Sequence, residues 1–367
     1  MYFHIILTTR CNSKCRYCYK KSCNDFPNNL TEKFDWDFST PETISYSLKD
    51  LKKFIEKDKD PVIIFYGGEP LLEIGKIKEI MDSINSRFII QTNAKLFDSF
   101  DTKYVNRFEK ILVSIDGDEK ITDFNKGKGT YAKVIKNVKL IKKNGFKGEI
   151  IARMVVDEYS NLIKEVLHLL TIFDSVHWQL DAGFYKNDYL KRDFSGFINK
   201  YNKEVKKLIN IWVEKMEKGK VLRIYPFLGI FNSIYYNKSE LLRCGSGFSN
   251  YTISTNGKIS VCPIMHDSKK YQVGDIFLSN PEKLKRIFVS EPCTTCDILN
   301  ICGGRCLYAN KAKLWPEKGQ KEICNSVRFL ISEIKSVTPK IGELIKQRKI
   351  KESDFVYEKY FGPEIIP

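Results

Sequence analysis

Short apolar runs alternate with amphipathic segments along the first 220 residues of the chain. The apolar runs have the length of buried strands, which we predict at 3–9, 61–66, 88–92, 111–115, 149–156 and 175–181. The segments between them have helical periodicity, and we predict helices at 44–57, 130–143, 161–173 and 194–218 and another that ends near 84. Thr40-Pro41 is a typical helix start, with proline at the first helical position. Continuous apolar strands alternating with helices indicate a parallel α/β sheet covered on both faces.

The alternation stops near residue 221, and a different organisation begins. Asn256-Gly257 predicts a β-hairpin over 251–262. The following segment is dense in cysteine, and we expect metal rather than a large apolar core to organise it. One amphipathic helix is predicted at 326–346. The predicted domains are 1–220 as the catalytic core, 221–243 as a bridging segment, 244–330 as a cysteine-rich domain and 331–367 as a C-terminal helix and tail.

Composition narrows the class of protein. The 367 residues are 43% hydrophobic, which suits a large globular domain with a smaller one beside it. No apolar run approaches the roughly 20 residues that span a bilayer, and no signal peptide precedes Cys11, so we expect a cytoplasmic protein without a membrane partner. The net charge of +16 comes from lysines spread along the predicted helices, which favours a solvated surface over a nucleic-acid partner.

Eleven cysteines in a chain without an export signal favour metal ligation over disulfides. Cys11, Cys15 and Cys18 follow the first strand at Cys-x3-Cys-x2-Cys spacing. This spacing can place three thiolates on one face of an iron–sulfur cluster and leave one iron open to another ligand. A partial zinc site and ordinary buried cysteines remain alternatives.

A second group of seven cysteines lies in the C-terminal third of the chain. Its members are Cys244, Cys262, Cys293, Cys296, Cys302, Cys306 and Cys324. Seven closely spaced thiols suggest two soft-metal sites, although Cys-x2-Cys also occurs in zinc ribbons.

Polar residues are expected where the predicted strands end, the edge at which parallel sheets bind ligands. The ligand-binding candidates are Gly67, Gly68, Glu69, Pro70, Asn93, Ser114, Asp116 and Arg153. Two glycines let backbone groups approach a ligand closely, although the same stretch could be a simple turn. Arg153 interrupts an apolar strand and needs an anion, either a ligand carboxylate or a structural one. Weaker candidates for proton transfer are His177, Asp181, His266 and Asp267, each with a structural role as the alternative.

The N-terminal motif resembles the signature of the radical S-adenosylmethionine (SAM) superfamily, in which SAM chelates the open iron. The resemblance puts Tyr17 at the aromatic position of that signature. It implies that Gly67-Gly68-Glu69-Pro70 is the glycine-rich motif that binds the amino group of SAM. It also implies a partial (β/α)6 barrel of the TIM type.

The seven C-terminal cysteines, with Gly257 between the first two, resemble the SPASM extension of radical SAM enzymes that modify peptides. The resemblance implies three [4Fe-4S] clusters, one for radical chemistry and two auxiliary. Cys293, Cys296, Cys302 and Cys324 would ligate one auxiliary cluster completely. Cys244, Cys262 and Cys306 would ligate the other, which lacks a fourth cysteine. Cys23 matches no position of the pattern and is interpreted as a spare thiol.

The whole chain is similar in length and organisation to anaerobic sulfatase maturases. Pro263 stands where those enzymes have an aspartate base, so the resemblance does not carry that base over. It implies reductive cleavage of SAM to a 5′-deoxyadenosyl radical, which removes hydrogen from a peptide or protein side chain and leads to a thioether, a carbon–carbon crosslink or an oxidised residue. The implied electron donor is a ferredoxin or flavodoxin.

Three alternatives remain open at this point. In the first, the same radical chemistry acts on a small molecule. In the second, the reaction is methyl transfer assisted by cobalamin. The third is a non-catalytic, zinc-stabilised module that binds RNA or protein, for which the N-terminal cysteines and their glycine-rich partner have no use.

Overall fold

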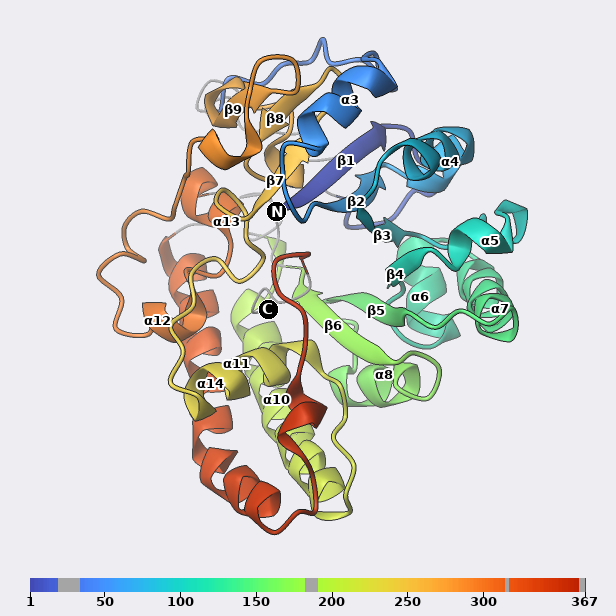
Figure 1. Ribbon diagram of the computed structural model, residues 1–367. Coiled ribbons are helices and arrows are strands. Elements are labelled where there is room, and N and C mark those ends of the chain that lie inside the picture. The colour runs from blue at the N-terminus through green and yellow to red at the C-terminus, as the bar shows by residue number, and fades with distance from the viewer. Residues whose placement is uncertain (19–33, 182–190, 314–316, 363–366) are drawn as a thin grey trace. The chain divides into compact units, whose positions relative to one another are not determined.

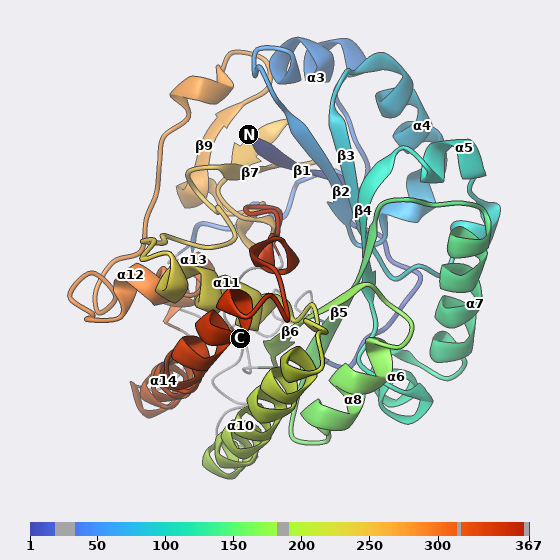
Figure 2. The same cartoon turned by 60° about the horizontal axis from the view of Figure 1, so that its bottom comes forward.

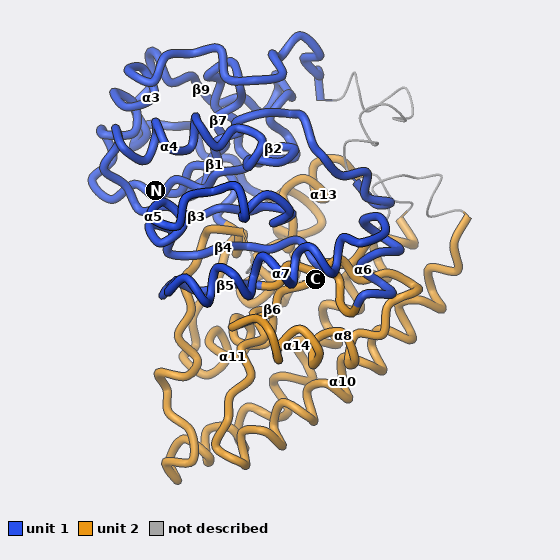
Figure 3. The backbone as a smooth tube through the Cα atoms, turned by 90° about the vertical axis from the view of Figure 1, so that its right-hand side faces the viewer, with its two compact units in different colours: residues 1–115, 119–151, 245–288 blue, residues 116–118, 152–244, 289–367 orange. Residues whose placement is uncertain are grey.

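The computed structural model describes residues 1–18, 34–181, 191–313, 317–362 and 367. Their contacts form two compact units, drawn in different colours in Figure 3. Unit 1 comprises residues 1–115, 119–151 and 245–288, and unit 2 comprises 116–118, 152–244 and 289–367. Cys23 lies outside the described residues.

Unit 1 is built on a sheet that is parallel at its centre. Its strands are β1 (Tyr2–Thr8), β2 (Val62–Gly67), β3 (Arg87–Thr92), β4 (Phe108–Ser114), β7 (Asn250–Ile253), β8 (Lys258–Ser260) and β9 (Gln272–Asp275). They lie in the order β4-β3-β2-β1-β7-β8-β9. Neighbours from β4 to β7 are parallel, whereas β8 pairs antiparallel with both β7 and β9. The hairpin predicted from Asn256-Gly257 is therefore β7–β8, and it extends the sheet beyond β1.

Helices line the outer side of this sheet, as Figure 2 shows for α3, α4, α5 and α7. The helices of unit 1 are α3 (Leu48–Ile55), α4 (Ile74–Ser83), α5 (Thr102–Val105), α6 (Glu119–Lys126) and α7 (Thr130–Lys143). The four residues at 62–65 of β2 are each at most 1% exposed. A strand buried on both faces needs this continuous apolar sequence, which explains why its pattern is easy to recognise.

Unit 2 combines two strands with long helices. β5 (Glu149–Val156) begins in unit 1 and continues into unit 2, where β6 (Ser175–Leu180) is its neighbour. The helices are α8 (Leu162–Leu169), α10 (Phe194–Glu217), α11 (Tyr225–Tyr235), α12 (Leu299–Cys302), α13 (Leu307–Ala312) and α14 (Glu317–Lys346), labelled in Figure 1. α10 packs along α14, where the Ser326 hydroxyl donates to Asn202 Oδ1 at 2.7 Å. Among the described helices, none has the length and apolar character needed to cross a bilayer.

The six predicted strands are all present, and the helices predicted at 130–143 and 194–218 match α7 and α10 within one residue. The predicted helix start at Thr40-Pro41 is wrong. α3 begins after Ser47, whose hydroxyl accepts the Asp50 N–H, because the preceding segment makes backbone bonds elsewhere, such as Ser45 N–H to Thr255 O at 2.8 Å. Sequence patterns missed α6, α11 and β9. The predicted domain boundaries stay a prediction; the two units divide the chain differently because β7 pairs with β1.

Candidate functional site

The three N-terminal cysteines lie in the loop that follows β1. A backbone hydrogen bond from Cys18 N–H to Cys15 O at 3.2 Å tightens the loop. Burial raises the pKa of the Cys11 thiol, and the charges of Glu69, Cys15 and Cys18 add to the rise. The three thiols share one short loop, as the ligands of one cluster would.

The end of β2 touches this loop through backbone atoms. Gly68 N–H donates to Thr8 O, and Glu69 N–H donates to Arg10 O, both at 2.8 Å. A Cβ atom at Gly68 would lie 2.1 Å from Arg10 O, and one at Gly67 would lie 2.3 Å from Thr8 O. Only glycine permits this approach, so in this structure both glycines serve the packing of the cysteine loop.

Glu69 joins three segments through its carboxylate. Its Oε1 accepts the Leu71 N–H at 2.9 Å and the Thr92 hydroxyl at 2.6 Å, and its Oε2 accepts the Asn93 N–H at 2.7 Å. The residue is 1% exposed, and burial raises its pKa although these hydrogen bonds oppose the rise. The Asn93 side chain in turn donates to Asn12 Oδ1 at 2.6 Å, inside the cysteine loop. Glu69 thus acts here as an internal clamp between β2, β3 and that loop.

Pro70 opens a short 3-10 helix, η1 (Pro70–Glu73), directly after this clamp. The proline sits at the first helical position, where its missing N–H removes no hydrogen bond. The stretch Gly67-Gly68-Glu69-Pro70, here called the GGEP stretch, therefore combines a close backbone approach, a buried carboxylate and a rigid turn.

Helix α6 holds the other side of the cysteine loop and was missed in the sequence. Arg16 donates twice to Asn125: its backbone N–H bonds the Asn125 carbonyl oxygen at 2.8 Å, and its Nε bonds Asn125 Oδ1 at 3.0 Å. Lys126 Nζ lies 4.9 Å from the centroid of the Tyr17 ring and donates to its hydroxyl. Both helix residues are buried. No spacing rule connects them to the cysteine motif, so sequence reasoning had no signal for them.

The predicted ligand residues of unit 2 make contacts of their own. Arg153, inside β5, donates from Nη1 to His177 Nδ1 at 3.0 Å and from Nη2 to Gln179 Oε1 at 3.1 Å. Because arginine is only a donor, His177 accepts at Nδ1 and carries its proton at Nε2. Asp116 is fully buried and accepts the Val155 N–H at 3.0 Å. Ser114 ends β4 in unit 1 and is half-buried.

The four proton-transfer candidates occupy different settings. His177 is fully buried against Arg153. Asp181 accepts from Arg192 Nη1 at 3.2 Å, and that arginine also pairs with Glu158. His266 Nδ1 and Asp267 Oδ1 lie 2.8 Å apart in unit 1. These partners are compatible with structural roles, and the assignment of a base stays a prediction.

Four of the C-terminal cysteines, Cys293, Cys296, Cys302 and Cys324, belong to unit 2. Burial raises the pKa of Cys293 to about 11, and the charges of Cys302, Cys324 and Cys296 contribute to the rise. Asn310 donates a hydrogen bond from Nδ2 to the Cys293 sulfur at 3.5 Å. The four thiols that the SPASM resemblance assigns to one cluster are thus near enough to influence one another.

Backbone geometry around Cys302 supplies further N–H groups to this set. Burial raises the pKa of Cys302, whereas hydrogen bonds from the Gly304 and Arg305 backbones oppose the rise. The turn that aims these groups has positive φ at three successive residues, with 73° at Gly303, 83° at Gly304 and 52° at Arg305. A Cβ at Gly304 would lie 2.8 Å from the Val289 side chain, so the two glycines are needed for both conformation and space.

The remaining three cysteines are divided between the units. Cys262 is buried in unit 1, while Cys244 and Cys306 belong to unit 2. Cys306 caps α13, where its sulfur accepts the Ala309 N–H at 3.5 Å. Their grouping around a second auxiliary cluster stays a prediction.

The donor set of these sites is almost purely thiol, which suits iron–sulfur clusters. In the described part of the chain, no three histidine, cysteine or acidic side chains converge closely enough to hold a single metal ion. Cluster ligands bind different irons and therefore stand further apart than ligands of one ion. The thiol groups at Cys11, Cys15 and Cys18 and at Cys293, Cys296, Cys302 and Cys324 fit such clusters.

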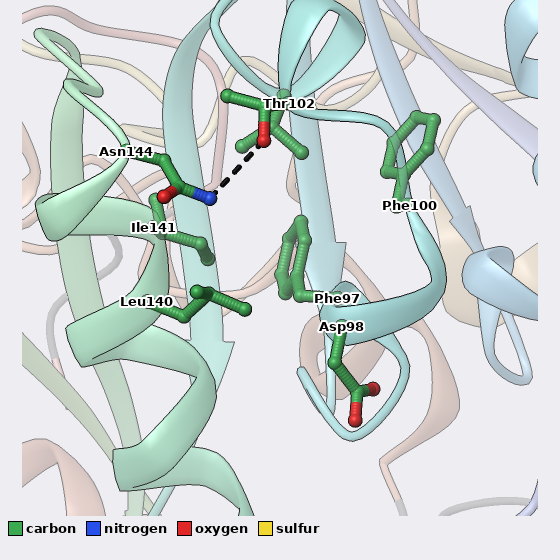
Figure 4. Close-up of a pocket in the computed structure, with 8 residues that line it drawn as sticks. Phe97, Asp98, Phe100, Thr102, Leu140, Ile141 and Asn144 are labelled. Atoms are coloured by element: carbon green, nitrogen blue, oxygen red, sulfur yellow. Dashed lines mark hydrogen bonds between the residues drawn. The ribbon is translucent and has the colours of Figure 1, made fainter.

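Unit 1 also has a small surface pocket, drawn in Figure 4, between the segment at 97–105 and α7. Its lining residues are Phe97, Asp98, Phe100, Thr102, Val105, Leu140, Ile141 and Asn144. Asn144 Nδ2 donates to Thr102 Oγ1 at 3.1 Å across it. The lining is mostly apolar and includes none of the predicted site residues, so we interpret the pocket as a packing crevice.

Comparisons with known proteins agree with this geometry. Residues 5–170 match the family described as the Radical SAM superfamily. The chain is 23% identical over 361 residues to the radical SAM cyclopropyl synthase TigE of Paramaledivibacter caminithermalis, an alignment that covers 90% of this chain and 73% of that protein. It is 25% identical over 339 residues to a cysteine-type anaerobic sulfatase-maturating enzyme of Clostridium perfringens, covering 83% of this chain and 87% of that protein.

Solved structures extend the likeness to the fold. Native anSMEcpe with bound AdoMet matches with a TM-score of 0.73 at 19% identity, covering 95% of this chain and 100% of that one. The same protein with AdoMet and the Cp18Cys peptide matches with a TM-score of 0.72 at 18% identity, covering 95% and 99%. This likeness confirms the predicted fold class, a partial (β/α)6 barrel with a cysteine-rich C-terminal region.

Proposed function

The chain belongs to the radical SAM superfamily, and on that premise we propose that it is a SPASM-type enzyme acting on a side chain of a peptide or protein. The observation that carries the proposal is the cysteine loop of unit 1. Three thiols share it, and Glu69 and Asn93 bind the surrounding segments together from within. A loop fixed in this way can present one open iron of a cluster to a ligand.

The proposed cofactors are SAM and [4Fe-4S] clusters. When bound, the cluster and SAM supply the oxidant, because reductive cleavage of SAM gives methionine and a 5′-deoxyadenosyl radical that removes hydrogen from carbon. The residues of the chain would hold these cofactors, orient the substrate side chain and exclude water. Cys11, Cys15 and Cys18 would ligate the cluster, while Tyr17 and the GGEP stretch would contact SAM.

The C-terminal thiols support the SPASM assignment and a total of three clusters. Cys293, Cys296, Cys302 and Cys324 supply a complete set of four ligands in unit 2. The sulfatase-maturating relative acts on a protein, and anSMEcpe binds a peptide, as their names state. We therefore propose a peptide or protein substrate, with a ferredoxin or flavodoxin as electron donor.

Anaerobic purification followed by iron and zinc analysis tests the cofactors. Three clusters of four predict about twelve irons per chain, whereas zinc without iron would favour a non-catalytic zinc module. With SAM and dithionite, the holoenzyme should release 5′-deoxyadenosine. Cys15→Ala should abolish this release and Cys23→Ala, the matched control at an unassigned thiol, should retain it.

The substrate class needs a separate experiment. Peptides encoded beside the gene should be incubated with the holoenzyme, SAM and dithionite and then analysed by mass spectrometry for a change in mass. A modified peptide supports the proposal. Radical formation with no modified peptide, together with turnover of a small molecule, would replace the peptide by a small-molecule substrate.

A further inference from the structure

An ion pair lies directly against the four-thiol set of unit 2. Arg328, on α14, donates from Nη2 to the Cys296 sulfur at 3.2 Å. The same guanidinium donates from Nη1 to Asp297 Oδ2 at 2.9 Å and also bonds the other carboxylate oxygen. Arg328 therefore connects a proposed cluster ligand to a carboxylate with a fork of charged hydrogen bonds.

Two more guanidinium groups face the same thiols. Arg243 is 2% exposed, and its Nε and Nη2 donate to Ile301 O at 2.9 and 2.7 Å. The charges of Arg243 and Arg305 both favour the thiolate of Cys302, and the charge of Arg305 also favours that of Cys324. A buried arginine needs a nearby anion, and a thiolate at Cys302 is one that this region can supply.

These charges have a consequence for a cluster bound at the four thiols. Adding one electron makes a thiolate-ligated cluster more negative. Hydrogen bonds to its sulfurs and nearby positive charge stabilise the reduced form and raise the reduction potential. Of the charged groups described above, Asp297 has the opposite sign. Its negative charge partly offsets that of Arg328 at the cluster and therefore lowers the reduction potential.

We propose that Arg328 and Asp297 form an opposed pair that sets the reduction potential of the cluster held by Cys293, Cys296, Cys302 and Cys324. Arg328 raises the potential and Asp297 lowers it. The redox step is the transfer of one electron from a low-potential one-electron carrier to the oxidised cluster, with no bond made or broken. Arg328 and Asp297 are positioning residues, since neither ligates iron. The inference rests on the proposed function, because it requires an iron–sulfur cluster at these thiols.

The test is a redox titration of the full-length, cluster-loaded chain, followed by electron paramagnetic resonance. Arg328→Gln should lower the midpoint potential of one cluster, because it leaves Asp297 unpaired beside Cys296. Asp297→Asn should raise it, because it frees the guanidinium. The double variant should lie between the two, and Arg328→Lys should stay nearer the parent. Shifts of opposite sign are not expected from a purely structural role.

Lys340→Gln serves as the matched control for charge. It removes a positive charge from the same helix, where Lys340 pairs with Glu217. Lys340 lies twelve residues after Arg328, which corresponds to about 18 Å along the helix axis. Such a distance exceeds the Debye length of about 8 Å at physiological salt, so the potential should not move.

The outcomes separate this inference from the proposed function. Zinc in place of iron at the four thiols overturns both. Full iron content with an unchanged midpoint potential in Arg328→Gln and Asp297→Asn, or with shifts of the same sign, overturns only the role of the pair. If Arg328→Gln fails to retain iron, Asp297→Asn and Arg328→Lys still decide the sign.

Discussion

The ammonium group of Lys126 lies over the ring of Tyr17, with 4.9 Å between Nζ and the ring centroid, and also donates to the Tyr17 hydroxyl. Both contacts fix the Tyr17 side chain, which in the sequence lies between two proposed cluster ligands, Cys15 and Cys18. Lys126 is 6% exposed, so solvent screens the interaction little. The tyrosine is thereby held in one orientation before any ligand binds.

We predict that Lys126→Met weakens SAM binding. The variant loses a cation–π contact and a buried hydrogen bond, together about 2 kcal/mol. SAM binding would then have to orient Tyr17 itself, which should raise the dissociation constant by up to roughly thirtyfold, the value reached if the whole of that energy is needed. The measurement is the change in the electron paramagnetic resonance signal of the reduced cluster as SAM is added. Lys126→Arg should lose less. Lys128→Met, at an exposed position of the following loop, should bind SAM normally, and equal affinities in all variants would contradict the prediction.

Gly68→Ala should displace the cysteine loop. Its new methyl group would meet Arg10 O at 2.1 Å, and overpacking of this kind costs about 1–3 kcal/mol. We expect lower thermal stability and loss of about four irons per chain, those of the N-terminal cluster.

The control for this substitution is Gly75→Ala, on α4, where a Cβ meets nothing within 4 Å. Alanine in a helix is more favourable than glycine by roughly 0.5–1 kcal/mol, so this variant should be neutral or slightly stabilised and keep its iron. Full iron content in both variants would show that the loop tolerates a wider separation from β2.

Glu69→Gln tests the internal clamp without any cofactor. A carboxylate accepts all three donors from Leu71, Thr92 and Asn93, but a carboxamide turns an NH2 group toward one of them. An unsatisfied buried donor costs about 1–3 kcal/mol, which should appear in the urea unfolding of the cluster-free chain. Glu73→Gln, which removes a surface pair with Arg10, should change stability by under about 1 kcal/mol. If Glu69 only contacted a ligand, neither variant would alter the cluster-free protein.

The strands could be predicted, and the cysteines could be proposed as cluster ligands, because each has a local signal. β2 is a continuous apolar run, and the cysteines stand at spacings that suit a cluster. Lys126 and Arg328 have no such signal. They are two of 61 lysines and arginines, and the first lies 109 residues from the tyrosine it contacts. Only the packing of α6 and α14 selects them.

The start of α3 shows a different limit of sequence reasoning. Thr40-Pro41 satisfies the local rule for a helix start, but the segment after it bonds to other strands and turns. Thr9 N–H donates to Glu42 O, and Thr8 forms an isolated bridge with Thr43. Local preference was overridden by backbone pairing that no short window of sequence contains.

Glu165, in unit 2, should make stability depend on pH. The residue is 3% exposed, and its Oε2 accepts the Asp118 N–H at 2.6 Å. Burial raises the pKa of Glu165 above its ordinary value of 4.5, although the Asp118 N–H and the Lys164 charge oppose the rise. Between 4.5 and the raised value, the folded chain therefore holds a proton that the unfolded chain has lost.

The sign of the effect follows from this difference in bound protons. The contribution of Glu165 to the free energy of unfolding falls as pH rises from 4.5 through the raised pKa, and it is constant above that. Glu165→Gln removes the titration while keeping an oxygen for the Asp118 N–H. The stability of the variant relative to the parent should therefore increase with pH over this window and then level off. Urea unfolding at a series of pH values measures it, and a relative stability that falls with pH would mean that the carboxylate is favoured in the folded state.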